Sequence, residues 1–357
     1  MTDLVSRLSA RALELCRLDS PIGQEKAIAD HIETWAKGRF AAVDVLRHSH
    51  SLVVGHLGDS RPSVALIGHL DTVPPHPGTQ PARIEGDRLI GLGSSDMKGA
   101  LAVMMALAED LPLPKLQVNL LLLFYEREEG PYLESGLGPL FQQAPALRDI
   151  RFAIAMEPTD NVVQLGCVGS LHATLRFFGA AAHSARPWQG ENAIHKAGPL
   201  LAELFSLPRR EVRVGGFTFY EVMSVTQASG GRARNVVPES FQLNLNYRFA
   251  PGKSVEEAQE EVRARVNGRA EVEFTDLAPS GRVCDDNPLL QKLLAVTGLP
   301  ATSKQAWTDV ARLASFGVDA VNFGPGETAQ AHQQYESASL PALAEAYRKL
   351  ELFLRAG

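Results

Sequence analysis

The chain has 357 residues, a formal net charge of −6 and 45% hydrophobic residues. A single hydrophobic core rarely grows beyond about 250–300 residues, so this length predicts two domains. The composition is that of an ordinary globular protein and argues against disorder. The negative charge argues against a nucleic-acid or anionic-membrane partner, because such partners favour a basic face.

The cysteines and the apolar runs indicate the cellular compartment of the protein. Cys16, Cys167 and Cys284 lie far apart and form no C-x-x-C spacing, so neither a disulfide framework nor a thiolate zinc site is indicated. The N-terminus lacks the uninterrupted apolar stretch of a signal peptide. The longest apolar runs, 100–108 and 120–125, are too short to cross a bilayer. We therefore expect a cytoplasmic protein with reduced, buried thiols.

The first half of the chain predicts alternating helices and strands. Apolar residues recur at helical spacing from Leu4 to Leu15, residues 20–23 form a turn, and a second helix follows at about 24–37. Short apolar strands are predicted at 51–57, 63–68, 120–125 and 152–156, with a helix at 99–111. Apolar strands separated by helices are typical of an α/β fold with both sheet faces covered.

The middle of the chain has a different pattern. Residues 171–178, 217–226 and 241–249 tend to alternate polar and apolar side chains, which predicts half-exposed antiparallel strands. Helices are predicted at 192–204 and 254–266, and after Pro288 the chain returns to helices and a short strand at 320–323. We therefore predict an α+β domain at 168–284, inserted into an α/β domain formed by residues 1–167 and 285–357.

A histidine and an aspartate follow one of the apolar strands. His69 comes directly after the strand at 63–67, at the end of the strand where α/β sheets place ligands. Asp71 can accept a proton from the second imidazole nitrogen and so raise the basicity of the first. Taken alone, this pair is equally compatible with a histidine satisfied within a loop.

A glycine-rich segment at 91–99 precedes the predicted helix at 99–111. Glycines before a helix can bind a phosphate. This segment, however, matches neither G-x-G-x-x-G nor a Walker motif, and Asp96 would direct a negative charge at the phosphate. Phosphate binding is therefore a poor interpretation of the segment.

Acidic residues follow the next two strands. Glu126, Glu128 and Glu129 come after the strand at 120–125, and Glu157 ends the strand at 152–156. Adjacent carboxylates repel one another unless a cation offsets them, so a buried Glu128–Glu129 pair would require a metal. A solvated acidic loop would carry the same residues, so this pattern alone leaves both interpretations open.

The combined pattern favours a metal centre. It contains two imidazoles and three carboxylates, mostly at strand ends: His69, Asp96, Glu129, Glu157 and His332. This is the ligand set required by two divalent ions with one bridging carboxylate. Such ions can bind and deprotonate one shared water.

In their order along the chain these motifs resemble the zinc aminoacylase and carboxypeptidase family, which includes succinyl-diaminopimelate desuccinylases and acetylornithine deacetylases. The supporting segments are 166–171, 182–186, 192–196, 235–238, 307–310 and 322–326. The resemblance implies a zinc-peptidase-like catalytic domain with a mixed sheet flanked by helices, and an inserted α+β lid and dimerisation domain. It also implies two Zn²⁺ per subunit, replaceable by Co²⁺ or Mn²⁺, a homodimer, and a small acyl amino acid as substrate.

The resemblance also implies roles for single residues. His69 and Glu157 would hold one zinc, Glu129 and His332 the other, and Asp96 would bridge them, with a cis peptide at Asp96–Met97. Asp71 resembles the partner of His69, and Glu128 matches the general base.

Further roles are implied outside the ligand set. His183 would reach the active site of a partner subunit and stabilise the oxyanion. Asn235 and Arg248 match substrate-binding positions of the lid domain, although a surface ion pair is an open alternative for Arg248. Thr308 and Gly324 match substrate contacts of the catalytic domain, whereas His172 and His195 are interpreted as structural.

Within this family the motifs match the desuccinylases of the actinobacterial type, which produce succinate and L,L-diaminopimelate for lysine and cell-wall precursor synthesis. Leu92 and Cys167-Val168 replace basic residues of other bacterial desuccinylases, and both changes remove positive charge that could meet an acidic substrate. The alternatives are an acetylornithine deacetylase, a broader N-acyl-amino-acid hydrolase or dipeptidase, or a non-catalytic binding protein with the same fold. A serine hydrolase based on Ser170 fits poorly, because this serine opens a strand instead of a strand-to-helix elbow.

Overall fold

The computed structural model describes residues 2–41 and 44–356. It divides into two compact units, each with its own core. Unit 1 comprises residues 1–166, 282–304 and 308–357, and unit 2 comprises residues 167–281 and 305–307. Two roles remain predictions. They are the catalytic role of residues 1–167 and 285–357, and the lid and dimerisation role of residues 168–284.

Unit 1 is built on an eight-stranded mixed sheet with the order β1-β2-β6-β3-β7-β17-β8-β16. The strands are β1 Val45–His48, β2 Ser51–Val54, β6 Asn119–Tyr125, β3 Ser63–His69, β7 Ile150–Ala155, β17 Ala320–Asn322, β8 Val163–Leu165 and β16 Ala301–Ser303. Strand β3 runs parallel to β6 and β7, and β17 runs parallel to β7. The carboxyl ends of these four strands therefore meet at one edge of the sheet.

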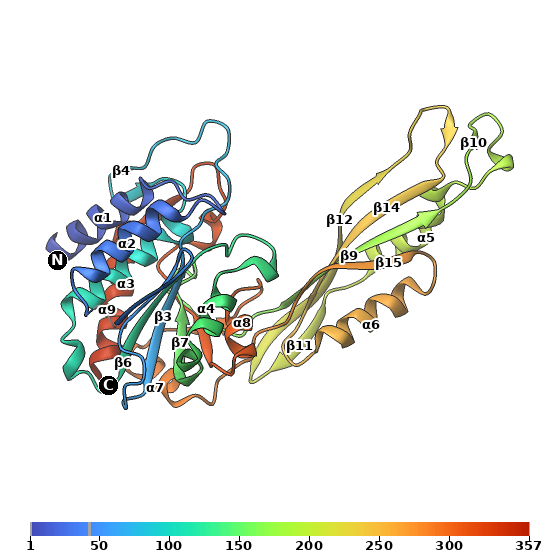
Figure 1. Ribbon diagram of the computed structural model, residues 1–357. Coiled ribbons are helices and arrows are strands. Elements are labelled where there is room, and N and C mark those ends of the chain that lie inside the picture. Colours follow the sequence, from blue (N-terminus) through green and yellow to red (C-terminus); the bar gives the residue numbers. More distant parts are fainter. Residues whose placement is uncertain (1, 42–43, 357) are drawn as a thin grey trace. The chain divides into compact units, whose positions relative to one another are not determined.

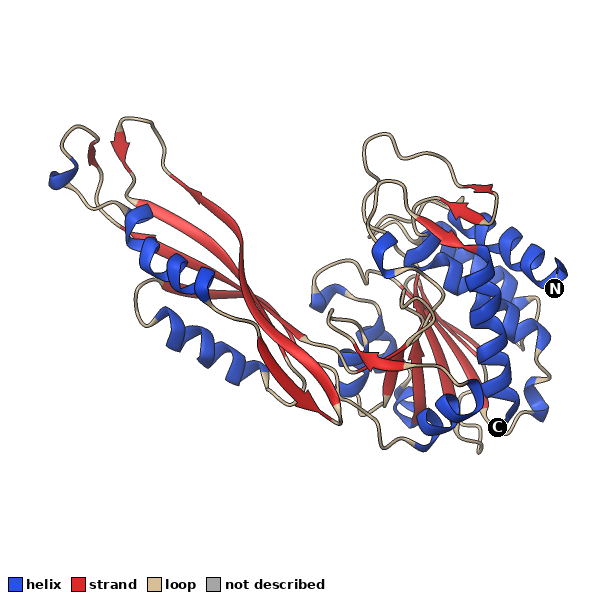
Figure 2. Ribbon diagram, turned by 180° about the vertical axis from the view of Figure 1, so that it is seen from behind, coloured by secondary structure: helices blue, strands red, loops and turns tan. Residues whose placement is uncertain are grey.

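Helices cover both faces of this sheet (Figures 1 and 2). Helices α1 (Thr2–Cys16), α3 (Gly99–Asp110) and α9 (Leu340–Ala356) pack against one another, and α7 (Pro288–Thr297) packs against α9. The other helices of unit 1 are α2 Lys26–Lys37, α4 Leu137–Gln143 and α8 Val310–Ser315. The two predicted N-terminal helices, the buried helix and the buried strands are thus confirmed. The burial of residues 99–108 explains why α3 has no polar face.

A small sheet joins two distant parts of unit 1. It has the order β18-β5-β4, with β4 Arg83–Glu85, β5 Arg88–Ile90 and β18 Ser337–Ser339. Short helical turns complete the chain: η2 Ser94–Lys98, η3 Leu113–Lys115, η4 Tyr132–Glu134, η5 Pro145–Asp149, η6 Pro187–Gln189 and η7 Thr328–Gln330. Because β18 pairs with β5, the segment after His332 lies beside the segment that leads to Asp96.

Unit 2 is a five-stranded antiparallel sheet with the order β11-β12-β14-β9-β15. The strands are β11 Arg210–Val214, β12 Phe217–Gly230, β14 Ser240–Phe249, β9 Gly169–Phe178 and β15 Glu271–Ala278. Helices α5 (Ala193–Ser206) and α6 (Val255–Val266) lie on the same face of this sheet (Figure 2). They pack their apolar sides on the inward residues of β9 and β14. A separate pair joins β10 (Ala182–His183) to β13 (Val236–Val237).

The fold class of an α/β domain with an inserted α+β domain is confirmed by this architecture. Strands β11 and β15 were not predicted, and both lie at the edges of the unit 2 sheet. Arg210, Glu211 and Arg213 on β11, and Glu271 and Glu273 on β15, give these strands a charged sequence. Charged residues protect an edge from pairing with other chains, and they also conceal the strand pattern.

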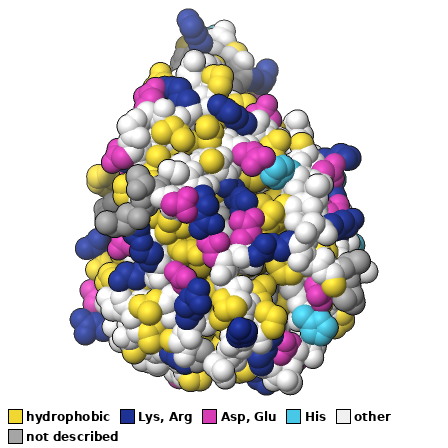
Figure 3. Space-filling view, turned by 90° about the vertical axis from the view of Figure 1, so that its left-hand side faces the viewer, with side chains coloured by type: hydrophobic (Ala, Val, Ile, Leu, Met, Phe, Trp, Pro, Cys, Tyr) yellow, Lys and Arg dark blue, Asp and Glu magenta, His cyan; other side chains and the backbone are white. Residues whose placement is uncertain are grey.

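Within the described chain, no helix combines the length and the apolar character needed to cross a membrane. The face drawn in Figure 3 carries basic and acidic side chains interspersed with apolar ones. Among the residues shown in colour on that face, neither charge forms a large separate patch.

Candidate metal centre

The five predicted ligands converge in unit 1. His69 is the last residue of β3, Glu129 and Glu157 follow β6 and β7, Asp96 lies in η2, and His332 lies in the loop before β18. Ligand atoms of His69, Asp96 and Glu157 lie within 4.8 Å of one another, and so do those of Asp96, Glu129 and His332. Asp96 therefore belongs to two groups, each of which could hold one ion.

The imidazole of His69 is oriented as a metal ligand. Its Nδ1 lies 3.0 Å from the carbonyl oxygen of Asp71, and because a carbonyl can only accept, Nδ1 carries the proton. In the neutral ring, the lone pair of Nε2 then faces Asp96 Oδ1 at 3.1 Å. A lone pair and a carboxylate attract each other only with a proton or another cation between them. The arrangement therefore fits a metal ion between His69 and Asp96.

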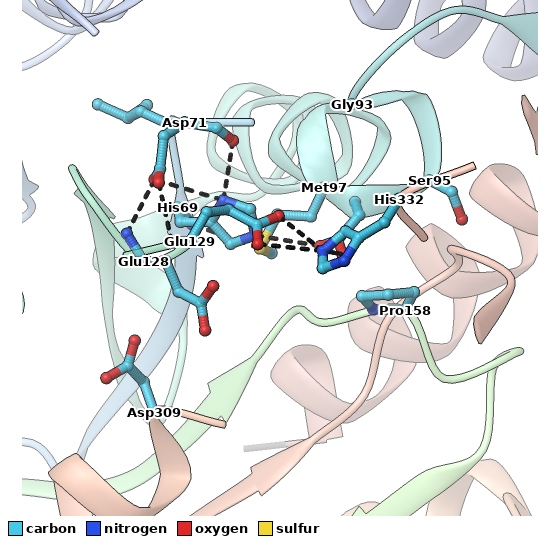
Figure 4. Close-up of polar contacts among 12 residues, drawn as sticks. His69, Asp71, Gly93, Ser95, Met97, Glu128, Glu129, Pro158, Asp309 and His332 are labelled. Carbon is cyan, nitrogen blue, oxygen red and sulfur yellow. Dashed lines mark hydrogen bonds and ion pairs between the residues drawn. The ribbon is translucent and has the colours of Figure 1, made fainter. Parts of the chain in front are cut away.

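Asp71 holds the loop after β6 with its carboxylate. Its Oδ1 accepts a hydrogen bond from the Glu128 N–H at 3.0 Å, and its Oδ2 accepts one from the Glu129 N–H at 2.9 Å (Figure 4). The same Oδ1 lies 3.6 Å from His69 Nδ1, too far for a hydrogen bond. The expected contact with His69 is thus made by the carbonyl of Asp71, while its carboxylate fixes the backbone of a ligand and of the predicted base.

Carboxylic acids crowd around the centre. Burial, with a contribution from Asp96, raises the pKa of Glu157 to about 7. Burial and the neighbouring Glu157 raise the pKa of Glu128 well above its usual value. Carboxylates in such surroundings become stable as anions when cations offset their charge. A donor set of carboxylate oxygens and imidazole nitrogens suits Zn²⁺, Co²⁺ and Mn²⁺.

His332 completes the second group from an exposed loop. Its Nε2 lies 3.1 Å from Glu129 Oε1 and 3.6 Å from Asp96 Oδ2. The hydrogen bond to Glu129 raises the pKa of His332 to about 9. The peptide bond Asp96–Met97 is cis, as the family resemblance implied.

Asp309 is a residue of the site to which the sequence assigned no role. Its carboxylate is fully buried and faces that of Glu128 (Figure 4). It accepts a hydrogen bond from the Tyr125 hydroxyl at 2.7 Å and one from Arg312 Nε at 2.5 Å. The predicted substrate contact, Thr308, precedes it and is buried. An acidic residue is common at the start of a helix, and Asp309 directly precedes the short helix α8. The sequence alone therefore did not distinguish a site residue from a helix cap at this position.

Gly324 packs against the backbone that carries Glu157. A Cβ atom on Gly324 would lie 2.4 Å from the carbonyl oxygen of Met156 and 2.5 Å from that of Glu157. A Cβ on Gly326 would lie 2.2 Å from the carbonyl oxygen of Ser95. The glycine loop therefore positions the segments of two predicted ligands, Asp96 and Glu157, in addition to the substrate contact predicted for Gly324.

Gly324→Ala is expected to destabilise the protein by about 1–3 kcal/mol, because the added methyl group overpacks a buried backbone contact. Denaturant unfolding of both proteins measures the difference. The control is Gly138→Ala in α4, where a Cβ meets nothing within 4 Å. This control should be neutral or up to about 1 kcal/mol more stable. Equal stabilities of the two variants would contradict the packing argument.

The other predicted residues lie in unit 2 and are described within it. His183 is exposed on β10, and its Nδ1 accepts a hydrogen bond from the Ala185 N–H at 3.0 Å, so the neutral ring carries its proton on Nε2. The carbonyl of Asn235 accepts a hydrogen bond from the Ser184 N–H at 2.9 Å. The pair β10–β13 thus brings His183 and Asn235 close together.

Two further polar residues lie on the strands of the unit 2 sheet. Arg248 is half-buried on β14, burial lowers its pKa, and its Nε donates to the side-chain oxygen of Asn246 at 3.0 Å. This contact is with an amide and not with a carboxylate. The ring nitrogens of His172 lie 3.1 and 2.9 Å from the side-chain amides of Asn244 and Asn246, which agrees with a structural role.

Comparison with known proteins relates this centre to a family. Residues 165–273 match the M20 peptidase dimerisation domain. A succinyl-diaminopimelate desuccinylase of Corynebacterium glutamicum is 32% identical over 347 residues, covering 95% of this chain and 94% of that protein. A protein of Mycobacterium tuberculosis named as the same enzyme is 35% identical over 341 residues, covering 95% of this chain and 96% of its own length. The chain belongs to the M20 family of metallopeptidases.

Solved structures of M20 proteins and other peptidases share the fold. The aminopeptidase PepT of Bacillus cereus matches with a TM-score of 0.79 at 18% identity, over 98% of both chains. A dinuclear metal binding peptidase of the M20 family from Bacillus subtilis matches with a TM-score of 0.70 at 15% identity, over 100% of this chain and 99% of that one. Membership of the M20 family makes this protein a metal-dependent hydrolase, and it confirms the resemblance stated from the motifs.

Proposed function

We propose that this M20 protein is a di-zinc desuccinylase that hydrolyses N-succinyl-L,L-diaminopimelate to succinate and L,L-diaminopimelate, for lysine and cell-wall precursor synthesis. The observation that carries the proposal is the pair of ligand groups that share Asp96, with Glu128 beside them. The names of the actinobacterial relatives, at 32 and 35% identity over almost the whole chain, support this substrate.

The two ligand groups support the following metal positions. His69 and Glu157 would hold one zinc, Glu129 and His332 the other, and Asp96 would contact both. When bound, such ions lower the pKa of a coordinated water to about 7 and polarise the amide carbonyl.

Glu128 is the proposed general base. It accepts a proton from the attacking water and returns this proton to the departing nitrogen, so that water and amide become a carboxylic acid and an amine, which separate at neutral pH as carboxylate and ammonium. Two observations support this assignment: the pKa of Glu128 is raised, and its backbone N–H donates a hydrogen bond to Asp71. Asp309 faces it from a fixed position, and its negative charge contributes to the raised pKa of Glu128.

Unit 2 supplies the remaining groups in this proposal. A homodimer would bring His183 of one subunit to the centre of its partner, where the Nε2–H stabilises the oxyanion. Removal of one such donor typically lowers kcat by about 10²–10³-fold. Asn235 and Arg248 would bind a substrate carboxylate, and Thr308 and Gly324 in unit 1 would contact the substrate.

The cross-subunit role of His183 predicts complementation. His183→Ala and Glu128→Gln subunits are each expected to be nearly inactive alone. After mixing and subunit exchange, a heterodimer has one centre with an intact Glu128 and a histidine from its partner, so about a quarter of wild-type activity should appear at equal mixing. Steady-state assays before and after exchange measure this gain. A mixture no more active than its parts would show that His183 acts within its own subunit or not at all.

The test of the proposed function is a substrate panel with metal content measured in parallel. Succinyl-diaminopimelate, acetylornithine and simple acyl amino acids would be compared by kcat/KM on protein loaded with two equivalents of zinc. The proposal requires the highest value for succinyl-diaminopimelate. A preference for acetylornithine would favour the deacetylase, and no turnover of any substrate at full metal content would favour a binding protein.

A further inference from the structure

Glu336 is a buried carboxylate that binds the loop carrying Asp96. Only 2% of its surface is exposed. Its Oε2 accepts a hydrogen bond from the Gly93 N–H at 2.7 Å, and its Oε1 accepts bonds from the Ser95 and Asp96 N–H groups at 2.8 and 2.9 Å. A buried carboxylate needs such donors, and here three backbone N–H groups of one loop supply them.

The backbone of Glu336 joins the same two segments. Its carbonyl accepts a hydrogen bond from the Gly91 N–H at 2.9 Å, and the next residue, Ser337, pairs with Ile90 in the small sheet. Glu336 follows His332 by four residues. The side chain and the backbone of one residue therefore fasten the His332 segment to the loop of Asp96.

The contacts of Glu336 distinguish it from a ligand. Both of its oxygens are occupied by backbone N–H groups, and the groups of metal-binding side chains found among the described residues do not include it. Its contacts also differ from those of a helix cap, because the bound loop lies 240 residues away in the sequence. The carboxylate thus acts on the geometry of Asp96 and not on an ion directly.

We propose that Glu336 is a positioning residue that sets the separation of Asp96 and His332, and with it the affinity of the ion held by Asp96, Glu129 and His332. The inference rests on the proposed di-metal function. The other group depends less on Glu336, because His69 ends β3 and Glu157 follows β7, the parallel neighbour of β3 in the sheet. Loss of the Glu336 carboxylate therefore weakens one ion selectively.

Glu336→Gln tests this role with a side chain of the same shape. An amide has one acceptor oxygen, so its NH₂ group must face at least one of the three backbone donors. Titration with Co²⁺, followed by visible absorption and calorimetry, should show two equivalents for the wild type. In the variant, one equivalent should bind as in the wild type and the second about 10–100-fold more weakly, the usual cost of losing an outer partner of a ligand.

The control is Glu327→Gln in the same loop, whose carboxylate contacts Arg88 at 2.8 Å and should leave both equivalents unchanged. Two unchanged equivalents in Glu336→Gln, or two weakened equally, would overturn the positioning role. A wild-type protein that binds fewer than two equivalents would overturn the di-metal function itself, and this role with it.

A measurement on the wild-type protein tests the contacts of Glu336 even if the Glu336→Gln variant does not fold. Hydrogen exchange of the metal-free protein should show slow exchange for the amides of Gly93, Ser95 and Asp96, because a buried carboxylate binds them. The reference is the amide of Gly58 in an exposed loop. Exchange of the three amides at the rate of Gly58 would overturn the proposal.

Discussion

Glu128→Gln is expected to lower kcat by about 10²–10⁴-fold, the usual contribution of a general base, while the zinc content stays unchanged. The amide has nearly the same size as the carboxylate but cannot accept the proton of the attacking water. The ligand groups that share Asp96 do not require the Glu128 side chain, so both ions should remain. Steady-state kinetics and metal analysis of the same preparation measure the two effects.

The control for this variant is Glu134→Gln. Glu134 is exposed and pairs with Arg127 at the surface, and it belongs to none of the candidate metal groups among the described residues. It should keep both its activity and its zinc. Near-normal turnover by Glu128→Gln would remove Glu128 as the base, and a loss of zinc in this variant would make it a ligand instead.

Asp96→Asn is expected to reduce the affinity for both ions together. The carboxylate of Asp96 belongs to both groups, and a neutral amide is a weaker ligand that offsets no charge. The loss of affinity should exceed the roughly 10–100-fold that removal of an outer partner costs, and activity should fall with the metal content. Metal analysis after dialysis against weak chelator, with activity assayed in parallel, provides the measurement.

Asp160→Asn is the matched control for Asp96→Asn. Asp160 is exposed and its carboxylate accepts a hydrogen bond from the Thr328 hydroxyl at 2.8 Å. This variant should retain both ions. If Asp96→Asn lost only one equivalent, the two groups would be independent and Asp96 would not be shared.

The parts of the fold that the sequence predicted are those in which burial determines the residue type. Strand β6 and helix α3 are buried over almost their full length, so their continuous apolar sequences were interpretable without any partner. Strands β11 and β15 were missed because an edge strand is selected for charge as much as for apolar alternation. The order of strands in each sheet could not be predicted from local patterns, because pairing depends on contacts between distant segments.

The candidate site divides in a similar way. His69, Glu129 and Glu157 follow apolar strands, so the rule that ligands gather at the ends of parallel strands was sufficient for them. His332 lies in a polar loop, so strand position did not indicate it, and only the combined pattern of two imidazoles and three carboxylates included it. Glu336 could not have been predicted, because its partners are backbone N–H groups, which leave no trace in the sequence.

The position of β17 has a consequence for biosynthesis. This strand lies between β7 and β8 in the sheet, but residues 320–322 leave the ribosome after all of unit 2. A nascent chain that ends before β17 has one unpaired edge of β7 and lacks His332. We therefore expect the contiguous segment 167–281 to fold first during translation, and the candidate metal centre to become complete only when the polypeptide is almost finished.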